Sequence, residues 1–460
     1  MTSTWLQALS QAESMIPLLG KLGREKAVKV ELAGNTLMAD SVTGLMAAFD
    51  KHPELDLAQV YQVLEQVLAS DLANTSVELE ALIAEADLES MLSAQTSSDA
   101  SGAQMPVVLY GFGRIGRLLA RRMCTLGHTT PGMALAAIVV RKACDNDLTK
   151  RASLLKYDSV HGVYEGIVKV DEENQALIIN GATVKVIYAS DPAEVDYQAH
   201  GINNALLVDN TGRWRDHDGL SVHLNRPGIE RVVLTAPGKE MRNIVFGVND
   251  SDITSEDKIV SAASCTTNAI APVLSVLESK YGIESGHVET VHAYTNDQNL
   301  IDNIHKGDRR GRAAGMNMVM TETGAAKAVS KAIPSLEGKL SGSAIRVPVI
   351  NVSIAVLSLN LKSAASVEEI NAAVKAASNS AELTGQIGYS DCADAVSSDF
   401  IGSSQAGIVD ALSTKVRDNQ AILYVWYDNE YGYSCQVVRL MEKLANASDV
   451  AAKQNESAAA

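Results

Sequence analysis

The chain has 460 residues and a formal net charge of −16; 46% of its residues are hydrophobic and 20% are charged. This length allows two or three domains, each with its own core, and the composition is ordinary for a globular protein. The acidic balance excludes general binding to nucleic acid or to anionic membranes, although it is compatible with a local basic pocket.

The five cysteines are scattered along the chain, odd in number and without a CxxC pair. This pattern predicts neither a disulfide framework nor a zinc site, and it fits a reducing compartment. The N-terminus lacks a basic stretch followed by an apolar core, and no apolar run is long enough to span a bilayer. We therefore expect a cytoplasmic protein.

Residues 1–93 have the pattern of a small, acidic and mainly helical unit. Apolar residues recur at helical spacing over 57–68, and similar patterns predict helices at 5–22 and 77–88. The segment 26–38 is ambiguous and is compatible with a short pair of extended segments. No group of side chains here suggests chemistry, so we expect a module that faces another subunit or an unknown partner.

Residues 94–104 are small and polar and predict a linker, after which the chain changes character. The apolar run 106–110 predicts a buried strand that leads directly into Gly-Phe-Gly-Arg-Ile-Gly at 111–116 and then a helix. In this context the glycines predict a dinucleotide-binding turn. The first permits a tight turn, the second lets a pyrophosphate approach, and the third packs helix against strand.

Further apolar runs alternate with helical segments, which predicts a doubly wound parallel sheet. The predicted strands are 134–140, 184–188, 206–209, 232–235 and 244–248. The second strand of such folds usually ends in an acidic residue that binds the adenosine ribose, but here Arg141-Lys142 follows it. This pair favours NADP, whose extra phosphate attracts cations, unless Asp145 or Asp147 turns back to take the acidic role.

A cysteine opens the next predicted helix. Ser264 is suited to cap that helix, so Cys265 would lie in its first turn, where free N–H groups and the helix dipole favour thiolate. A buried structural cysteine is the alternative. Together with a nucleotide fold, an activated cysteine suggests aldehyde oxidation through a thioester. His292, at the end of a predicted strand over 287–294, is the candidate base; a satisfied core histidine is its alternative.

The last third of the chain has the patterns of an α+β domain. Residues 295–320 form a long loop rich in Gly, Arg and Asn, which is typical of a functional or interface segment. The polar residues 447–460 predict a disordered tail. The other predicted elements are strands at 343–361 and 422–427 and helices at 367–377 and 433–445.

From about residue 105 to 446, the chain resembles the phosphorylating glyceraldehyde-3-phosphate dehydrogenase family. Seven ordered stretches match: GFGRIGR at 111–117, LLKYDSVHG at 154–162, SCTTN at 264–268, HAYTNDQ at 292–298, TGAAKAV at 323–329, IRVP at 345–348 and WYDNEYGYS at 426–434. The resemblance implies an α/β Rossmann domain over 105–264 and 429–446, and an α+β catalytic domain with a mixed or antiparallel sheet over 265–428. It also implies a homotetramer.

The resemblance further implies roles for individual residues. Cys265 is the nucleophile and His292 the general base. The substrate-phosphate site comprises Thr295, Asp297, Arg310 and Arg346, and the site for attacking inorganic phosphate comprises Ser264, Thr266, Thr323 and Gly324. The cofactor contacts are Gly111, Phe112, Gly113, Arg114, Ile115, Gly116, Thr211, Thr235, Asn429 and Tyr433, to which the residue pattern adds Arg141. No metal is expected.

Several positions depart from the family pattern. Tyr110 replaces the usual asparagine before the first glycine, and Ala269 replaces a second cysteine. Met320 stands where proline is common, and Glu322 brings a negative charge to the attacking-phosphate loop, which leaves phosphate affinity open. The largest departures are the ending of the second strand and the added N-terminal unit.

The expected function is oxidation of glyceraldehyde 3-phosphate to 1,3-bisphosphoglycerate with NAD or NADP and inorganic phosphate. Alternatives within enzymes are oxidation of erythrose 4-phosphate, or a non-phosphorylating reaction in which water takes the acyl group. A slow paralogue that binds a partner through residues 1–93 is the alternative from another class. Metabolic direction and regulation stay open.

Overall fold

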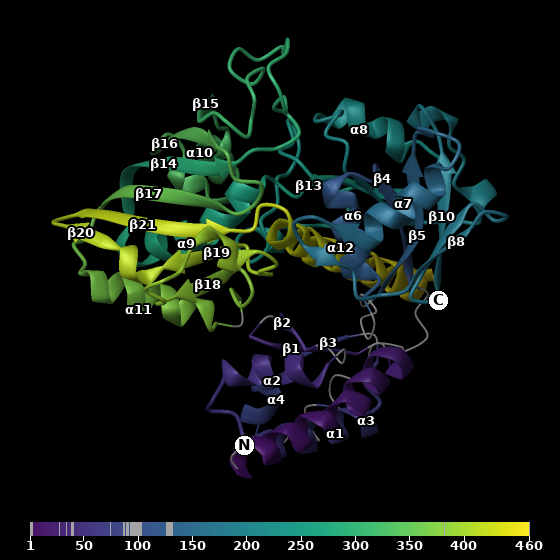
Figure 1. Ribbon diagram of the computed structural model, residues 1–460, viewed down its shortest axis with the longest axis horizontal. Coiled ribbons are helices and arrows are strands. Elements are labelled where there is room, and N and C mark those ends of the chain that lie inside the picture. The colour runs from purple at the N-terminus through teal and green to yellow at the C-terminus, as the bar shows by residue number, and fades with distance from the viewer. Residues whose placement is uncertain are drawn as a thin grey trace.

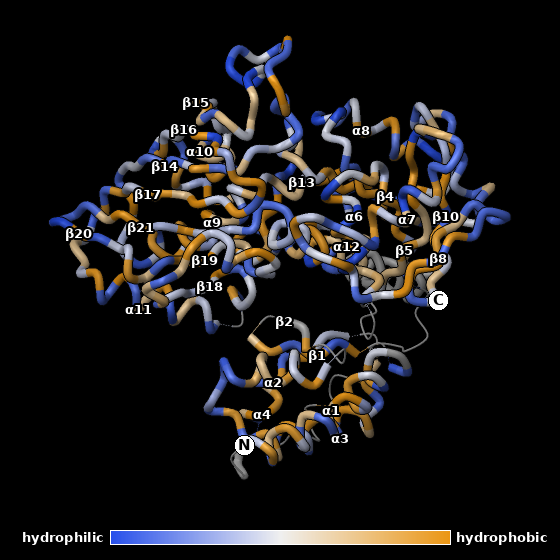
Figure 2. The backbone as a smooth tube through the Cα atoms, viewed as in Figure 1, coloured by the Kyte–Doolittle hydropathy of each residue, from blue (hydrophilic) through white to orange (hydrophobic). Residues whose placement is uncertain are grey.

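The structure is a computed structural model that describes the chain except residues 1–2, 27, 34, 38–40, 74, 86–87, 89–91, 93–103, 126–131, 381 and 460. Figure 1 shows three groups of elements: a small N-terminal unit at the bottom of the view and two larger sheets with their helices above it. In Figure 2 the hydrophobic colour follows the strands of the larger sheets, whereas the outer tip of the β20–β21 hairpin is hydrophilic.

The N-terminal unit combines helices with a small sheet. Its strands are ordered β2-β1-β3, with β1 and β2 antiparallel and β1 and β3 parallel. Buried residues such as Met15, Leu45 and Leu64 form a core of its own. The elements are α1 (Ser3–Lys26), β1 (Lys29–Leu32), β2 (Asn35–Thr36), α2 (Val42–Asp50), α3 (Leu57–Ala69), β3 (Ser76–Glu78) and α4 (Leu79–Ala84).

Sequence patterns predicted much of this unit. The helices over 5–22 and 57–68 and the extended pair within 26–38 are confirmed by α1, α3 and the β1–β2 pair. The single helix over 77–88 is wrong, because Val77 lies in β3, which pairs with β1, and a helix begins only at Leu79. Nearly all of the predicted linker 94–104 lies outside the described residues.

The second group is built on an eight-stranded sheet in the order β13-β12-β11-β4-β5-β10-β9-β8. Neighbours from β13 to β10 are parallel, and β9 and β8 add an antiparallel edge. The strands are β4 (Met105–Tyr110), β5 (Met133–Val140), β8 (Val168–Asp171), β9 (Ala176–Ile179), β10 (Ala182–Tyr188), β11 (Ala205–Asp209), β12 (Ile229–Leu234) and β13 (Ile259–Ser261).

Helices and loops cover both faces of this sheet, which explains its continuous apolar strands. One face packs against α6 (Arg114–Met123), α7 (Asp147–Lys156) and α12 (Tyr431–Ala459), and the other carries α8 (His217–Leu224). A small β6–β7 pair (Tyr157–Asp158, Gly162–Val163) follows α7. The predicted doubly wound α/β domain is confirmed.

Two predictions in this region differ from the structure. Residues 244–248 are not a strand: Ile244 and Val245 are buried in a loop whose backbone bonds go to Ser261 and to the Asn249 side chain. Burial rather than strand pairing explains their apolar character. At the C-terminus, α12 extends to Ala459, across most of the segment predicted to be a disordered tail.

The third group contains a mixed sheet in the order β15-β16-β14-β17-β21-β19-β18, with β20 beside β21. Burial alternates along β17, because one face packs on α9 (Cys265–Tyr281) and α11 (Val367–Ser378). A third helix is α10 (Ala325–Ala332). The strands are β14 (Ile283–Ala293), β15 (Val319–Glu322), β16 (Leu340–Val347), β17 (Ser353–Leu361), β18 (Ile387–Ser390), β19 (Gly407–Asp410), β20 (Lys415–Arg417) and β21 (Gln420–Tyr427).

The N-terminal unit meets the second group through a charged contact. The buried ammonium of Lys29, in β1, lies 3.9 Å from the Glu442 carboxylate in α12 and 2.5 Å from that of Glu31. Among the described residues, no helix combines the length and apolar character needed to cross a membrane.

Candidate active site

The turn between β13 and α9 places Cys265 at the start of a helix. Ala263 adopts a left-handed backbone (φ 57°), and Ser264 caps α9 by accepting a 3.0 Å hydrogen bond from the Thr267 N–H. Asn268 braces the turn by donating to the carbonyls of Ala262 and Ser264, at 2.8 and 2.9 Å. The predicted helical start at Cys265 is therefore confirmed, and its side chain packs against the cores of both large sheets.

His292 lies near the end of β14 and faces the thiol. The Cys265 Sγ is 3.6 Å from His292 Nε2, and His292 Nδ1 is 2.6 Å from the Ala293 carbonyl. Because a carbonyl oxygen only accepts, Nδ1 must carry the proton, which leaves Nε2 of the neutral ring as an acceptor toward the sulfur. The two residues that the sequence proposed as nucleophile and base are thus within contact distance.

Enclosure by the protein sets the charge state of this pair. Burial raises the pKa of the Cys265 thiol, and the opposing effects of Arg346 and of hydrogen bonds at Thr266 do not overcome it. Burial, aided by Arg346, lowers the pKa of His292 to about 4. The free site therefore pairs a thiol whose pKa is raised with a neutral imidazole, and burial opposes the stabilisation of thiolate that is expected from the helix start.

Four predicted anion-site residues gather beside the pair. Arg346, which lies opposite His292 in the β14–β16 register, donates to Thr295 Oγ1 at 2.9 Å. Asp297 lies 2.9 Å from the Arg310 guanidinium and 3.7 Å from that of Arg346. The buried Arg346 Nε has no hydrogen-bond partner among the described residues. Two guanidinium groups and a hydroxyl fit a phosphate group.

The second predicted anion set is divided between two places. The Ser264 hydroxyl is used in capping, and Thr266 Oγ1 is 2.9 Å from the buried Tyr427 hydroxyl. Thr323 and Gly324 lie at the start of α10, where Thr323 Oγ1 accepts from the Ala325 N–H at 3.1 Å. No hydrogen bond among the described residues joins Thr323 to the α9 turn, so their common role stays a prediction.

The glycine turn at the carboxyl edge of β4 fits a dinucleotide phosphate. Gly111 has a φ of +93°, and a Cβ at Gly116 would lie 2.4 Å from the Gly111 carbonyl. In contrast, a Cβ at Gly113 would meet nothing within 4 Å. Gly113 is the N-cap residue of α6, so no side chain accepts from the first N–H groups of this helix. The helix start therefore presents free N–H groups to an open space, as a bound pyrophosphate requires.

The other predicted cofactor residues lie around the same edge. Thr211 follows β11 and bonds to Asp209 Oδ1 through its N–H and hydroxyl, at 2.7 and 2.6 Å, and Thr235 follows β12 and donates to the Asp209 carbonyl at 3.0 Å. Arg141 follows β5 and is exposed. Phe112 is buried and Ile115 packs against the sheet core, so their side chains hold the turn in place.

The Arg114 guanidinium has a structural task. It bonds to Glu430 at 2.9 Å, to His161 at 3.2 Å and to Asp158, and so fastens the start of α12 to α6. This leaves the backbone N–H of Arg114, rather than its side chain, for contact with a phosphate.

Asn429, just before α12, connects through Ser353 to the residue next to His292, and Tyr433, in the first turn of α12, contacts the turn before Cys265. Asn429 Oδ1 accepts from the Ser353 hydroxyl at 2.9 Å, and that hydroxyl accepts from the Ala293 N–H at 3.1 Å. The Tyr433 hydroxyl donates to the Ala263 carbonyl at 3.0 Å. Sequence reasoning missed the linking Ser353, because its partners are distant in the chain and no local pattern marks it.

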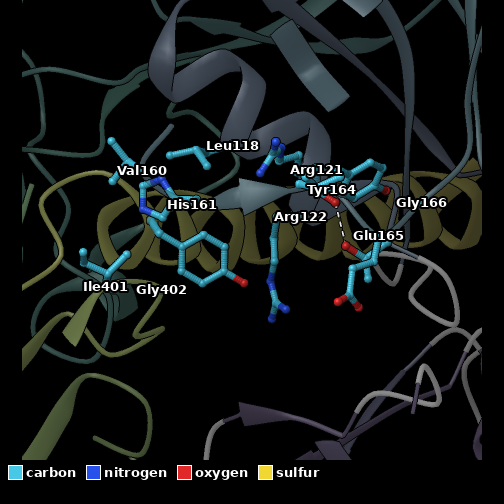
Figure 3. A pocket seen from close by; sticks show the side chains of 13 residues that line it. Leu118, Arg121, Arg122, Val160, His161, Tyr164, Glu165, Gly166, Ile401 and Gly402 are labelled. Atoms are coloured by element: carbon cyan, nitrogen blue, oxygen red, sulfur yellow. Dashed lines mark hydrogen bonds between the residues drawn. The ribbon is translucent and has the colours of Figure 1, made fainter. Parts of the chain in front are cut away.

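A cavity of about 490 Å³ lies elsewhere, between α6, residues 160–166 and the start of α12. Figure 3 shows Arg121, Arg122 and His161 around it. Arg121 is satisfied by the Leu155 and Gly162 carbonyls, at 2.8 and 3.0 Å. Neither Cys265 nor His292 lines this cavity, so it is not the predicted catalytic centre.

Comparisons with known proteins agree with this geometry. The family model "Glyceraldehyde 3-phosphate dehydrogenase, NAD binding domain" matches residues 105–217, and "Glyceraldehyde 3-phosphate dehydrogenase, C-terminal domain" matches 264–429. A glyceraldehyde-3-phosphate dehydrogenase-like protein of Pseudomonas aeruginosa is 51% identical over 454 residues, which cover 94% of this chain and 98% of that protein.

Shorter relatives match only part of this chain. Glyceraldehyde-3-phosphate dehydrogenase of Borreliella burgdorferi is 43% identical over 350 residues, which cover 74% of this chain and 99% of that protein. Glyceraldehyde-3-phosphate dehydrogenase 2 of Bacillus subtilis is 41% identical over 345 residues, which cover 74% of this chain and 97% of that protein.

Proposed function

This chain belongs to the glyceraldehyde-3-phosphate dehydrogenase family, and on that premise we propose that it oxidises glyceraldehyde 3-phosphate reversibly to 1,3-bisphosphoglycerate with NAD(P) and inorganic phosphate. The observation that carries the proposal is the 3.6 Å contact between the Cys265 thiol and the His292 acceptor nitrogen, beside two arginines that share Asp297.

The first step uses the neutral pair. As the Cys265 sulfur attacks the aldehyde carbon, its proton passes to His292 Nε2. His292 then gives this proton to the former carbonyl oxygen, which completes the hemithioacetal, and takes it back as hydride leaves the carbon. Arg310 and Arg346 hold the substrate phosphate and so orient the aldehyde toward the sulfur. NAD(P), which the glycine turn over 111–116 and Asn429 would hold, would supply the acceptor for the hydride that leaves this carbon, so that Cys265 would carry a thioester.

The second step releases the product. An oxygen of inorganic phosphate attacks the thioester carbon, the carbon–sulfur bond breaks, and the acyl phosphate leaves while Cys265 regains a proton. We assign binding of the attacking phosphate to Ser264, Thr266, Thr323 and Gly324. The start of α10 supports this assignment, because the N-terminus of a helix favours an anion.

The test is turnover of purified full-length protein with glyceraldehyde 3-phosphate or erythrose 4-phosphate, with and without inorganic phosphate, followed by formation of reduced cofactor. We expect glyceraldehyde 3-phosphate to have the higher kcat/KM and the rate to require phosphate. A higher kcat/KM for erythrose 4-phosphate would contradict the substrate assignment. A phosphate-independent rate that yields the free acid would indicate that water takes the acyl group.

We also propose a homotetramer in the cytoplasm, with domains at 105–264 plus 429–446 and at 265–428. The long loop 295–320 supports self-association, because it exposes large apolar side chains to solvent. Its exposed members include Leu300, Ile304 and Met316, which are 76%, 97% and 82% exposed. Light scattering of the purified chain measures the assembly, and a monomer at micromolar concentration would contradict it.

A further inference from the structure

The loop after β5 bears on the choice between NAD and NADP, and the inference drawn from it rests on the proposed dehydrogenase function. Arg141 and Lys142 follow the strand directly and are exposed. Asp147 is buried, and its carboxylate accepts from the Ala143 N–H at 2.9 Å and pairs with Arg151. Because both oxygens are engaged at the start of α7, Asp147 does not turn back to the ribose position.

A second basic loop faces the first across β4. Asp209 in β11 lies opposite Tyr110 in β4, and Tyr110 lies opposite Val139 in β5, so the three strands end at one edge. Adjacent strands are about 4.8 Å apart, which places the loops after β11 and β5 about 10 Å apart, on either side of the glycine turn. The exposed Arg213 belongs to the β11 loop.

An aromatic group adjoins these cations. The Arg213 guanidinium lies 4.8 Å from the centre of the Trp214 ring, which packs edge-on against Tyr110 at 6.0 Å. Burial, with a contribution from Asp209, raises the pKa of Tyr110 to about 12, while Arg213 and Arg141 both oppose that rise. Both arginines therefore lie close enough to the Tyr110 phenol to act on it electrostatically.

Two of the acidic groups near this edge, Asp209 and Asp191, are used within the protein. Asp209 accepts from Thr211 and lies 3.1 Å from His223 Nε2, and Asp191 accepts from the Ala193 N–H at 2.9 Å. Asp145 is exposed on the loop before α7. A ribose with two free hydroxyls would thus find no carboxylate directly after β5, whereas a phosphate would find arginine forks that bind it in bidentate fashion.

We propose that Arg141 and Arg213 bind the 2′-phosphate of NADP, with Trp214 against the adenine, and that the enzyme prefers NADP to NAD. The apolar ring supports the base, while the two guanidinium groups read the phosphate that distinguishes the cofactors.

Direct binding tests the proposal without turnover. Titration calorimetry on the full chain compares adenosine 2′,5′-bisphosphate with adenosine 5′-monophosphate, which lacks the 2′-phosphate. We expect the bisphosphate to bind at least tenfold more tightly, and Arg141→Asp and Arg213→Ala each to remove most of that difference. Lys150→Asp is the matched control for Arg141→Asp: it makes the same charge change at an exposed site on α7 and should leave the difference intact.

Kinetics supply the second measurement. The ratio of kcat/KM for NADP over NAD should exceed one in the native enzyme and fall at least tenfold in Arg141→Asp. A native preference for NAD of tenfold or more, or a ratio that Arg141→Asp leaves unchanged, overturns the proposal. Loss of NAD binding in Asp145→Asn, with an unchanged affinity for adenosine 2′,5′-bisphosphate, would also overturn the proposal, because Asp145 would then bind the ribose hydroxyls.

The outcomes separate this inference from the proposed function. If the protein binds adenosine 2′,5′-bisphosphate through Arg141 but does not oxidise glyceraldehyde 3-phosphate, the cofactor inference stands and the substrate proposal fails. If it oxidises the aldehyde with NAD and binds both adenosine phosphates equally, the substrate proposal stands and the cofactor inference fails.

Discussion

At the scale of single residues, two opposing forces act on the Cys265 thiol. The start of a helix stabilises a negative charge by roughly 0.3–1 kcal/mol, which is less than the 1.4 kcal/mol or so that corresponds to one pKa unit. Burial raises the pKa of the thiol despite Arg346 nearby. The sulfur therefore depends on a proton acceptor, and His292, with a pKa of about 4, is an unprotonated acceptor throughout the neutral range.

Cys265→Ser should abolish dehydrogenase turnover, by several orders of magnitude, because a serine hydroxyl at this position is a far weaker nucleophile. Cofactor binding should persist, since no predicted cofactor contact is removed; titration with reduced cofactor measures it. Cys392→Ser, at an exposed cysteine, is the control and should keep full activity. Retention of more than about a tenth of the native rate in Cys265→Ser would sink the assignment of the nucleophile.

His292→Asn should lower kcat by roughly 10²–10⁴-fold, the usual contribution of a positioned base. It should also slow the alkylation of Cys265 at neutral pH, because no ring nitrogen would then take the thiol proton as the sulfur attacks. His287→Asn is the control, since His287 lies on the same strand and bonds to Ser341 and Ser343 instead. An unchanged alkylation rate in His292→Asn would argue against the pair.

At the scale of elements, the start of α12 is held to the dinucleotide sheet by a cluster of charges. Asp428 accepts from the N–H groups of Glu430 and Tyr431, at 2.9 and 2.8 Å, and lies 2.9 Å from His161 Nε2. Arg114 joins Glu430 to Asp158. This cluster keeps Asn429 at the edge where the cofactor is proposed to bind.

Asp158 makes the stability of this junction dependent on pH. Burial opposes its ionisation, but hydrogen bonds from the N–H groups of His161 and Val160 and the charge of Arg114 outweigh burial and lower its pKa to about 2. The unfolded value is about 3.9. Because the folded pKa is the lower one, the stabilisation is complete above about pH 4 and is lost as pH falls toward 2.

Asp158→Asn should therefore lower the free energy of unfolding by about 2 kcal/mol at neutral pH, and the deficit should shrink as pH falls from about 4 to 2. Thermal unfolding midpoints at a series of pH values measure this trend. Asp394→Asn, at an exposed position, should change little at any pH. A deficit for Asp158→Asn that is the same at every pH would show that its charge is not responsible.

At the scale of the whole molecule, the N-terminal unit has its own core and meets the rest of the chain through a charged contact at Lys29. The relatives from Borreliella burgdorferi and Bacillus subtilis are covered almost completely by 74% of this chain. The relative from Pseudomonas aeruginosa covers 94%, which must include much of residues 1–93. Most of the unit is thus matched by the relative from Pseudomonas aeruginosa, whereas the relatives from Borreliella burgdorferi and Bacillus subtilis are too short to contain it.

We predict that residues 105–460 fold and catalyse without the N-terminal unit, because every proposed site residue lies beyond it and its core is separate. The truncated chain should keep kcat/KM within about threefold of the full chain and remain tetrameric by light scattering. Lys29→Ala in the full chain is the companion variant, which weakens the contact while the unit stays attached. An insoluble or inactive truncation would make the unit an integral part of the enzyme.

Local signals in the sequence were enough to predict the backbone conformation around the site. The glycine turn, the Ser264 cap and the position of His292 near a strand end each depend on neighbours within a few residues, and all three are confirmed. Patterns of burial were less reliable where an apolar stretch had no strand partner, as at 244–248, because burial selects apolar residues whether or not a strand forms.

Only the tertiary structure decided how the charged and titratable groups are used. The low pKa of His292 depends on enclosure and on Arg346 from another strand, and the Arg114 guanidinium is bound by Glu430, which is distant in the chain. The sequence leaves Asp147 open as a ribose ligand, whereas in the structure its carboxylate is engaged at the start of α7. A sequence records the local preferences of its backbone, whereas electrostatic energy depends on solvent exclusion and on separations that exist only after distant segments pack.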